Sequence, residues 1–205
     1  MGRFIGVSLV ASLLMAGLGC VEASESNAVL VLSTPTVEKR VSAACFDFMR
    51  TNVMGMLRRD RTLLRAAGFG PEEQLKAFSA MRSERDALVV VLVNTPASSA
   101  PAVVYSVRLG CAVVNTAVIA AIDGLTDQGR LARIERAAMY GLGRLVGMPA
   151  CLNPFCALSE YEHVQKDKIP GRNYCPNCCD RVAAGLRAVG VQERVNTRAK
   201  TAPSE

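Results

Sequence analysis

Cysteine has the clearest chemical pattern in this chain of 205 residues, which holds eight cysteines and only one histidine, His163. Four of the cysteines form two pairs, Cys151 with Cys156 and Cys175 with Cys178. Two thiolate pairs about twenty residues apart are typical of a tetrahedral site with four sulfur ligands, which holds a structural zinc ion. The spacing therefore predicts one zinc ion at these four cysteines.

Other uses of the same cysteines are consistent with the sequence. In an oxidising compartment they could form disulfides, and Cys175 with Cys178, ahead of a helix expected over 180–189, could form a redox-active pair. The redox motif normally follows a strand, and Asn173-Tyr174 is a poor strand sequence. Cys179 could also replace Cys178 as the fourth ligand. Zinc binding is the favoured interpretation, and thiol–disulfide exchange is an alternative.

The remaining cysteines and the histidine give no second metal site. Cys45 and Cys111 follow apolar patterns and are predicted to be buried thiols. A catalytic zinc ion needs two or three imidazoles, and this chain can offer only His163. A replacement site would have to combine it with neighbouring acidic residues, although a lone histidine beside acids is usually a surface group. Those residues are Glu160, Glu162 and Asp167. We therefore expect no catalytic zinc.

The two ends of the chain differ in composition from the middle. Arg3, the apolar stretch 4–18 and Val21-Glu22-Ala23 predict a signal peptide over residues 1–23. Cys20 is a possible lipid anchor if the signal is that of a lipoprotein. We expect an exported protein, whether periplasmic, secreted or lipid-anchored, and a cytoplasmic one if the start is misassigned. The polar residues 191–205 are predicted to be a disordered tail, which leaves 28–190 as the folded domain.

The basic charge does not by itself indicate a nucleic-acid partner. The formal net charge is +6, but the chain has no Trp, four Tyr and six Phe to interleave with a basic groove. The densest basic run is Arg58, Arg59, Arg61 and Arg65, at a spacing compatible with the solvated face of a helix. We therefore expect no nucleic-acid binding.

Apolar runs predict the strands that must position the cysteines. The segments 28–33 and 88–93 are short, β-branched and apolar, which is typical of buried strands, and 88–93 should be central in the sheet. The segments 103–109 and 111–116 flank Gly110 and predict a hairpin.

Helices are expected between these strands. Thr34 as N-cap and Pro35 as first helical residue begin one helix, which Gly55 ends, and Gly70-Pro71 begins another. A longer helix is expected from a cap at Asp127 to about Met148. It contains Gly141, Gly143 and Gly147, which favour either close packing or a weak helix.

The end of that helix joins a motif that has a known counterpart. The sequence there is Tyr140-Gly-Leu-Gly-Arg144-Leu-Val-Gly147-Met-Pro-Ala150-Cys151-Leu-Asn-Pro-Phe-Cys156-Ala-Leu158. It resembles the core motif of the archaemetzincin zinc metallopeptidases, His-Glu-x-x-His-x-x-Gly-x-x-His-Cys-x4-Cys-x-Met with a distal Cys-x-x-Cys. Gly147 and the four paired cysteines match. The resemblance implies an α/β, metzincin-like compact domain with a mixed sheet flanked by helices and a C-terminal segment stapled by a four-cysteine zinc site.

The positions that would carry catalysis in this family depart from its motif. Tyr140, Arg144 and Ala150 stand at the three histidine positions, Gly141 at the glutamate, and Leu158 at the methionine. Without these groups no water can be activated on zinc. The resemblance then implies a catalytically inactive pseudopeptidase with a binding or scaffold role, and an active metallopeptidase with a non-standard site is the alternative. Relatives lay peptides along an edge strand, so strand 103–109 or 111–116 could still pair with an extended peptide.

Overall fold

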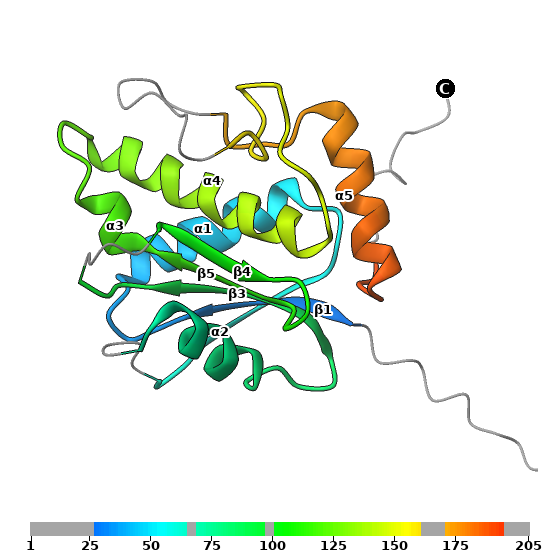
Figure 1. Cartoon of the computed structure of the whole chain (residues 1–205), viewed down its shortest axis with the longest axis horizontal. Coiled ribbons are helices and arrows are strands. Elements are labelled where there is room, and N and C mark those ends of the chain that lie inside the picture. Colours follow the sequence, from blue (N-terminus) through cyan, green and yellow to red (C-terminus); the bar gives the residue numbers. More distant parts are fainter. Residues whose placement is uncertain (1–26, 65–68, 97–100, 161–170, 195–205) are drawn as a thin grey trace, which may run out of the picture.

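The protein, seen in a computed structural model that describes residues 27–64, 69–96, 101–160 and 171–194, is built around one five-stranded mixed sheet (Figure 1). The strand order is β2-β1-β3-β5-β4, and β4 is antiparallel to β5 whereas the other pairs are parallel. The strands are β1 (Ala28–Ser33), β2 (Leu57–Arg61), β3 (Asp86–Val93), β4 (Val103–Ser106) and β5 (Cys111–Asn115). The expected α/β fold with a mixed sheet is confirmed.

Helices cover both faces of this sheet (Figure 1). The helices are α1 (Lys39–Asn52), α2 (Pro71–Ser79), α3 (Thr116–Ala120), α4 (Asp127–Leu145) and α5 (Pro176–Ala188). One core cluster joins Val29 and Val90 of the sheet to residues of α1, α4 and α5, and the other joins Leu30 and Val91 to Phe78 of α2. Because β1, β3 and β5 are buried on both faces, their sequences are continuous apolar runs. The predicted strands 28–33 and 88–93 and the predicted hairpin are confirmed.

Several helix ends differ from the sequence predictions. The first helix does not begin at Thr34-Pro35, because Val37 N–H closes a turn on the Thr34 carbonyl and the helix starts at Lys39. The N-cap of α4 is Thr126, whose hydroxyl accepts from Gly129 N–H, and α4 ends at Leu145. Helix α5 starts at Pro176, earlier than expected. Local turns and caps set these boundaries, and the apolar periodicity does not report them.

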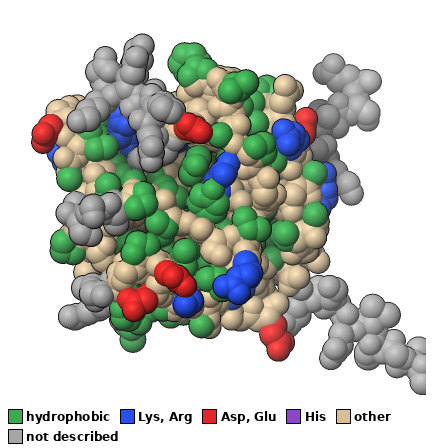
Figure 2. All heavy atoms as spheres, viewed as in Figure 1, with side chains coloured by type: hydrophobic (Ala, Val, Ile, Leu, Met, Phe, Trp, Pro, Cys, Tyr) green, Lys and Arg blue, Asp and Glu red, His purple; other side chains and the backbone are tan. Residues whose placement is uncertain are grey.

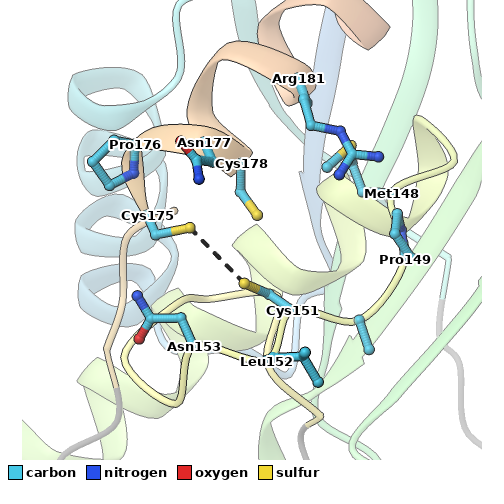
Figure 3. A pocket seen from close by; sticks show the side chains of 11 residues that line it. Met148, Pro149, Cys151, Leu152, Asn153, Cys175, Pro176, Asn177, Cys178 and Arg181 are labelled. Atoms are coloured by element: carbon cyan, nitrogen blue, oxygen red, sulfur yellow. Dashed lines mark hydrogen bonds between the residues drawn. The ribbon is translucent and has the colours of Figure 1, made fainter.

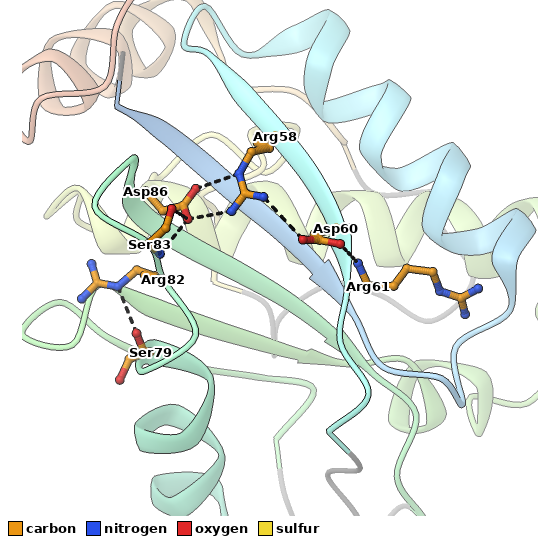
Figure 4. Close-up of polar contacts among 7 residues, drawn as sticks. All are labelled: Arg58, Asp60, Arg61, Ser79, Arg82, Ser83 and Asp86. Atoms are coloured by element: carbon orange, nitrogen blue, oxygen red, sulfur yellow. Dashed lines mark hydrogen bonds and ion pairs between the residues drawn. The ribbon is translucent and has the colours of Figure 1, made fainter. Parts of the chain in front are cut away.

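The arginine-rich run is a strand and not the expected helix face. Leu57–Arg61 forms β2, which pairs only with β1 in the described sheet. Its side chains are largely solvated, so the apolar alternation that marks a strand is absent. Arg58 reaches across to Asp86 at the start of β3, with Nη2 2.7 Å from Oδ2 (Figure 4). Arg65 lies outside the described residues.

The folded domain continues beyond residue 190. Gln192 N–H donates to the Asn27 carbonyl at 3.1 Å, and Met56 N–H donates to the Gln192 carbonyl at 2.8 Å. Arg194 N–H bonds the Met54 carbonyl at 2.8 Å. The backbone is thus held as far as Arg194, within the stretch that the sequence predicts to be a tail. Residues 1–26, with the predicted signal and Cys20, and residues 195–205 lie outside the described residues.

Among the described helices, none combines the length and apolar character needed to cross a membrane.

Candidate metal centre

Four cysteine sulfurs converge between the end of α4 and the start of α5. Cys151 and Cys156 lie in the loop after α4, Cys175 is the N-cap of α5, and Cys178 lies in its first turn. Their Sγ atoms all lie within 4.8 Å of one another. The side chains of Cys151, Cys175 and Cys178 point toward a common centre (Figure 3). The structure therefore brings together the four residues that the spacing singled out, with Cys178 and not Cys179 as the fourth member.

The separation of the sulfurs fits a tetrahedral zinc ion. Cys151 Sγ and Cys175 Sγ are 3.9 Å apart. With Zn–S bonds of about 2.3 Å, the edge of a tetrahedron of four sulfurs around zinc is about 3.8 Å. A disulfide needs about 2.05 Å, and the described cysteines are all free thiols. The donor set and its spacing thus suit zinc. A bound zinc ion would hold all four sulfurs as thiolates and link the loop to the helix.

The surroundings of the sulfurs are not uniform. Cys175 N–H donates to Cys156 Sγ at 3.3 Å. A hydrogen bond from the Cys178 backbone, at the N-terminus of α5, holds the pKa of the Cys175 thiol below its ordinary value. Burial raises the pKa of Cys156 and of Cys178. Cys175 therefore ionises more readily than Cys156 and Cys178, and these buried thiols need a cation to become thiolates.

One side of the cluster is open to solvent. Cys156 and Cys178 are buried, whereas Cys151 and Cys175 are partly exposed. A cavity of about 500 Å³ lies beside them (Figure 3). Met148, Pro149, Leu152, Pro176 and Arg181 are among its lining residues. A chelator can therefore reach a metal ion here without unfolding of the domain.

Contacts to α4 hold the second cysteine pair in place. Arg172 Nη1 lies 2.6 Å from the buried Glu135 carboxylate, and its guanidinium lies over the Phe48 ring at 5.0 Å. Tyr174 Oη donates to the Met139 carbonyl at 2.6 Å. Burial raises the pKa of Tyr174, so its hydroxyl stays a donor. Sequence reasoning missed these residues, because even their partners on α4 lie 37 and 35 residues away in the chain, beyond the reach of any periodicity.

The glycines at the end of α4 permit close packing. A Cβ at Gly143 would lie 2.5 Å from Leu158 Cδ2, and one at Gly141 would lie 3.0 Å from Ala112 Cβ. Gly147 has φ of +78° and turns the chain toward Cys151. Of the two interpretations that the sequence left open, the structure favours close packing.

Tyr140 and Arg144 in the last turns of α4 form a cluster with Tyr105 of β4. Arg144 donates to Tyr105 Oη from both Nε, at 2.9 Å, and Nη2, at 2.7 Å. Its guanidinium also lies over the Tyr105 ring at 5.2 Å and the Tyr140 ring at 5.9 Å. Burial raises the pKa of Tyr140, and the Arg144 cation offsets part of that rise. Tyr140, Gly141 and Arg144 are thus close together, whereas Ala150 is exposed in the following loop.

Tyr105 was not singled out by the sequence, and only its place as the one aromatic residue of β4 could have drawn attention to it.

The other residues that the sequence singled out lie outside the cysteine cluster or outside the described residues. In the described ranges the four paired cysteines form the one group suited to a metal ion. Glu160 is exposed, and its expected partners His163, Glu162 and Asp167 lie outside the described residues. Cys45 and Cys111 are buried as predicted, and burial raises the pKa of Cys111 to about 12.

Solved structures of archaemetzincins share this fold. The archaemetzincin of Methanopyrus kandleri superposes with a TM-score of 0.61 over 82% of this chain and 99% of its own, at 15% identity. A zinc-dependent peptidase of Methanocorpusculum labreanum gives 0.57 over 75% and 99%, at 14% identity. The archaemetzincin of Archaeoglobus fulgidus, complexed with malonate, gives 0.53 over 75% and 99%, at 10% identity.

At these identities the likeness shows the fold alone, which is archaemetzincin-like with a C-terminal four-cysteine cluster. No protein-family model matches the chain. No curated protein matches it in sequence.

Proposed function

We propose that this protein is an exported, catalytically inactive relative of the archaemetzincins that holds one structural zinc ion and binds extended peptides. Export rests on the signal-like pattern of residues 1–23. The zinc ion rests on the four converging sulfurs. Peptide binding rests on the shared fold and on a terminal strand of the sheet, β4.

The observation that carries the loss of activity is the position of Arg144. In the motif that this chain resembles, positions 140, 144 and 150 are zinc-binding histidines and position 141 is a glutamate. Here a guanidinium, bonded to Tyr105 Oη, lies next to Tyr140 on the same helix. A permanent cation disfavours a second cation at the same place, and glycine at position 141 offers neither acid nor base. The described side chains at this place supply no substitute for the lost ligands.

The strand that would receive a peptide is β4. Strand β5 was also a candidate, but it lies between β3 and β4 and both of its edges are paired, so it is excluded. Strand β4 is terminal and carries the uncharged sequence VVYS. A terminal strand without charges is one that a further strand can join.

Zinc stoichiometry and peptidase activity test the proposal together. We expect one zinc ion per purified chain by elemental analysis, and less than about a tenth of that in Cys175→Ser, because the cluster loses one of its four ligands. Cys179→Ser is the matched control, since it removes the neighbouring thiol outside the cluster, and it should retain the full zinc content. Mixed fluorogenic peptides incubated with zinc-loaded protein should not be hydrolysed above the buffer rate.

Each alternative activity has its own result. Two zinc ions per chain, or hydrolysis that a chelator abolishes, would show an active metallopeptidase and refute the loss of activity. A metal-free protein that reduces disulfides, with Cys175 alkylated faster than Cys151, would show a thiol–disulfide oxidoreductase instead.

A further inference from the structure

Arg144 has a different kind of partner from Arg58 and Arg172, each of which binds a buried carboxylate. Arg58 binds the Asp86 carboxylate at 2.7 Å, and Arg172 binds the Glu135 carboxylate at 2.6 Å. Arg144 instead directs two donors to the phenol oxygen of Tyr105. Among the described residues no carboxylate forms an ion pair with it. A guanidinium has five N–H donors, so donors remain for a ligand.

Tyr105, which binds this cation, belongs to the terminal strand β4. Asn115 N–H donates to the Ala102 carbonyl at 2.9 Å, and the register pairs Val104 with Val113 and Tyr105 with Ala112. In an antiparallel ladder the bonded pairs alternate with non-bonded pairs. The backbone N–H and C=O of Val103 and Tyr105 therefore point away from β5, toward the side where a further strand would pair.

The side chains of β4 alternate in the same way. Val103 and Tyr105 pack against the core cluster on the α4 face, and Val104 packs against the cluster on the α2 face. A residue opposite Tyr105 on an added strand would present its side chain on the face of Tyr105, with the two Cβ atoms about 5 Å apart. That face is the one on which Arg144 lies. In Figure 2 hydrophobic side chains gather in the middle of this view, between scattered charged ones.

We propose that Arg144 selects extended peptides that carry an acidic side chain opposite Tyr105. This inference rests on the proposed peptide binding along β4 and names the class of peptide. The ligand group is the carboxylate of Asp or Glu, because a guanidinium with donors to spare, and with no acidic partner within the described part of the chain, is complementary to it. Tyr105 and Tyr140 position Arg144, and the outward backbone groups of Val103 and Tyr105 hold the peptide.

A displayed peptide library tests this selection. Random peptides fused through their C-termini to a phage coat protein carry no free terminal carboxylate, so any enriched acid belongs to a side chain. We expect enrichment of Asp or Glu at one position on the zinc-loaded protein. An amidated synthetic copy of a selected peptide should lose roughly tenfold or more in affinity when that acid is changed to its amide. The same change should have little effect on binding to Arg144→Gln.

Three variants make the result specific. Arg108→Gln removes the same charge from the exposed turn after β4 and should keep the preference for the acid. Arg144→Lys keeps the charge without the guanidinium fork and should keep part of the preference. Val103→Pro removes an outward N–H without breaking a β4–β5 bond, so it should weaken all selected peptides alike. Zinc content and the unfolding midpoint verify that each variant folds.

The outcomes separate this inference from the proposed function. Selected peptides that depend on Val103 but show no preference for an acid would refute the role of Arg144 and leave peptide binding intact. A preference that survives in Arg144→Gln would refute it equally. If peptides with a free C-terminus and no acidic side chain bind more tightly, the ligand of Arg144 is the terminal carboxylate of the peptide. That result would overturn the proposed selection of an acidic side chain. If no peptide binds through β4, both proposals fail.

Discussion

At the level of single residues, Asp86 is a buried acid that accepts hydrogen bonds from several donors. Its side chain has no exposed area. Besides Arg58, the N–H and Oγ of Ser83 donate to it at 2.9 and 2.6 Å (Figure 4). Burial by itself would raise the pKa of Asp86, but the hydrogen bonds from Arg58 and Ser83 outweigh it and lower the pKa below its ordinary value. The carboxylate thus links Arg58 of β2 and the turn before β3 to the first residue of β3.

Removing this charge should destabilise the protein only where the carboxylate is ionised. Asp86→Asn should lower the free energy of unfolding by about 1 to 2 kcal/mol at pH 7, because charge-assisted hydrogen bonds are lost and Arg58 is partly solvated. A lowered pKa stabilises the folded state fully above the unfolded value of about 3.9. The contribution is lost as the pH falls through the lower folded value. Urea unfolding of both proteins at several pH values should show the difference shrinking below about pH 4.

The matched control is Asp60→Asn, which removes the exposed partner 3.4 Å from the same guanidinium. Exposed ion pairs contribute little, so this change should cost less than about 0.5 kcal/mol at every pH. An equal loss in both variants would mean that the burial of Asp86 has no bearing on its contribution.

The residues of the site were predictable to different degrees. The spacing of Cys151, Cys156, Cys175 and Cys178 suffices to suggest a common centre, because each pair is local in sequence. The Tyr105–Arg144 and Glu135–Arg172 contacts were not predictable, because each partner is placed by a different element. A pattern of residue types reports local geometry, whereas these contacts depend on how the elements pack.

At the level of elements, the same distinction separates β3 from β2. Burial on both faces leaves β3 a continuous apolar run, which is visible in sequence, and its central place was predicted. The exposed β2 carries LRRDR, a sequence with no strand periodicity, and it was mistaken for a helix face. Terminal strands that are protected by charge are therefore the elements that sequence patterns identify least well.

Two glycines near the cysteine cluster differ in what an added Cβ would contact. A Cβ at Gly171 would overlap the backbone carbonyl of Phe155, whereas one at Gly143 would meet the side chain of Leu158. Gly171→Ala should therefore cost about 2 to 3 kcal/mol. Gly143→Ala should cost less, about 1 kcal/mol, because Leu158 can turn and alanine favours the helix. Chemical denaturation of the zinc-loaded proteins would check this order, and the reverse order would contradict the described packing.

At the level of the whole molecule, the loop 151–159 and α5 are joined to the rest of the domain both by core packing and by the cysteine cluster. Both faces of β3 are buried by helices, whereas the loop with Cys151 and Cys156 has little regular structure. A structural zinc ion contributes about 10 to 16 kcal/mol of apparent folding free energy in zinc-finger peptides. Zinc should therefore stabilise the two parts of this protein unequally.

Metal removal should act on one part before the other. In a chelator, amide hydrogen exchange over 151–159 and α5 should accelerate at least about a hundredfold, because local opening no longer costs the zinc bonds. Amides of β3 should change far less. Cys156→Ser without chelator should give the same pattern, and Cys179→Ser should leave it unchanged. Uniform acceleration across β3 and α5 would show instead that the domain depends on the metal throughout.

The two borders of the sheet have unequal chemistry. Strand β2 presents Arg58, Arg59, Asp60 and Arg61 to solvent, whereas β4 ends the other side with no charged residue. The charges therefore disfavour the addition of a further strand to β2, whereas a further strand can pair with β4. Such a unit can accept a single guest strand, or pair β4 edge to edge with β4 of a second copy about a two-fold axis, whereas the charges on β2 disfavour the repeated addition that a fibril needs.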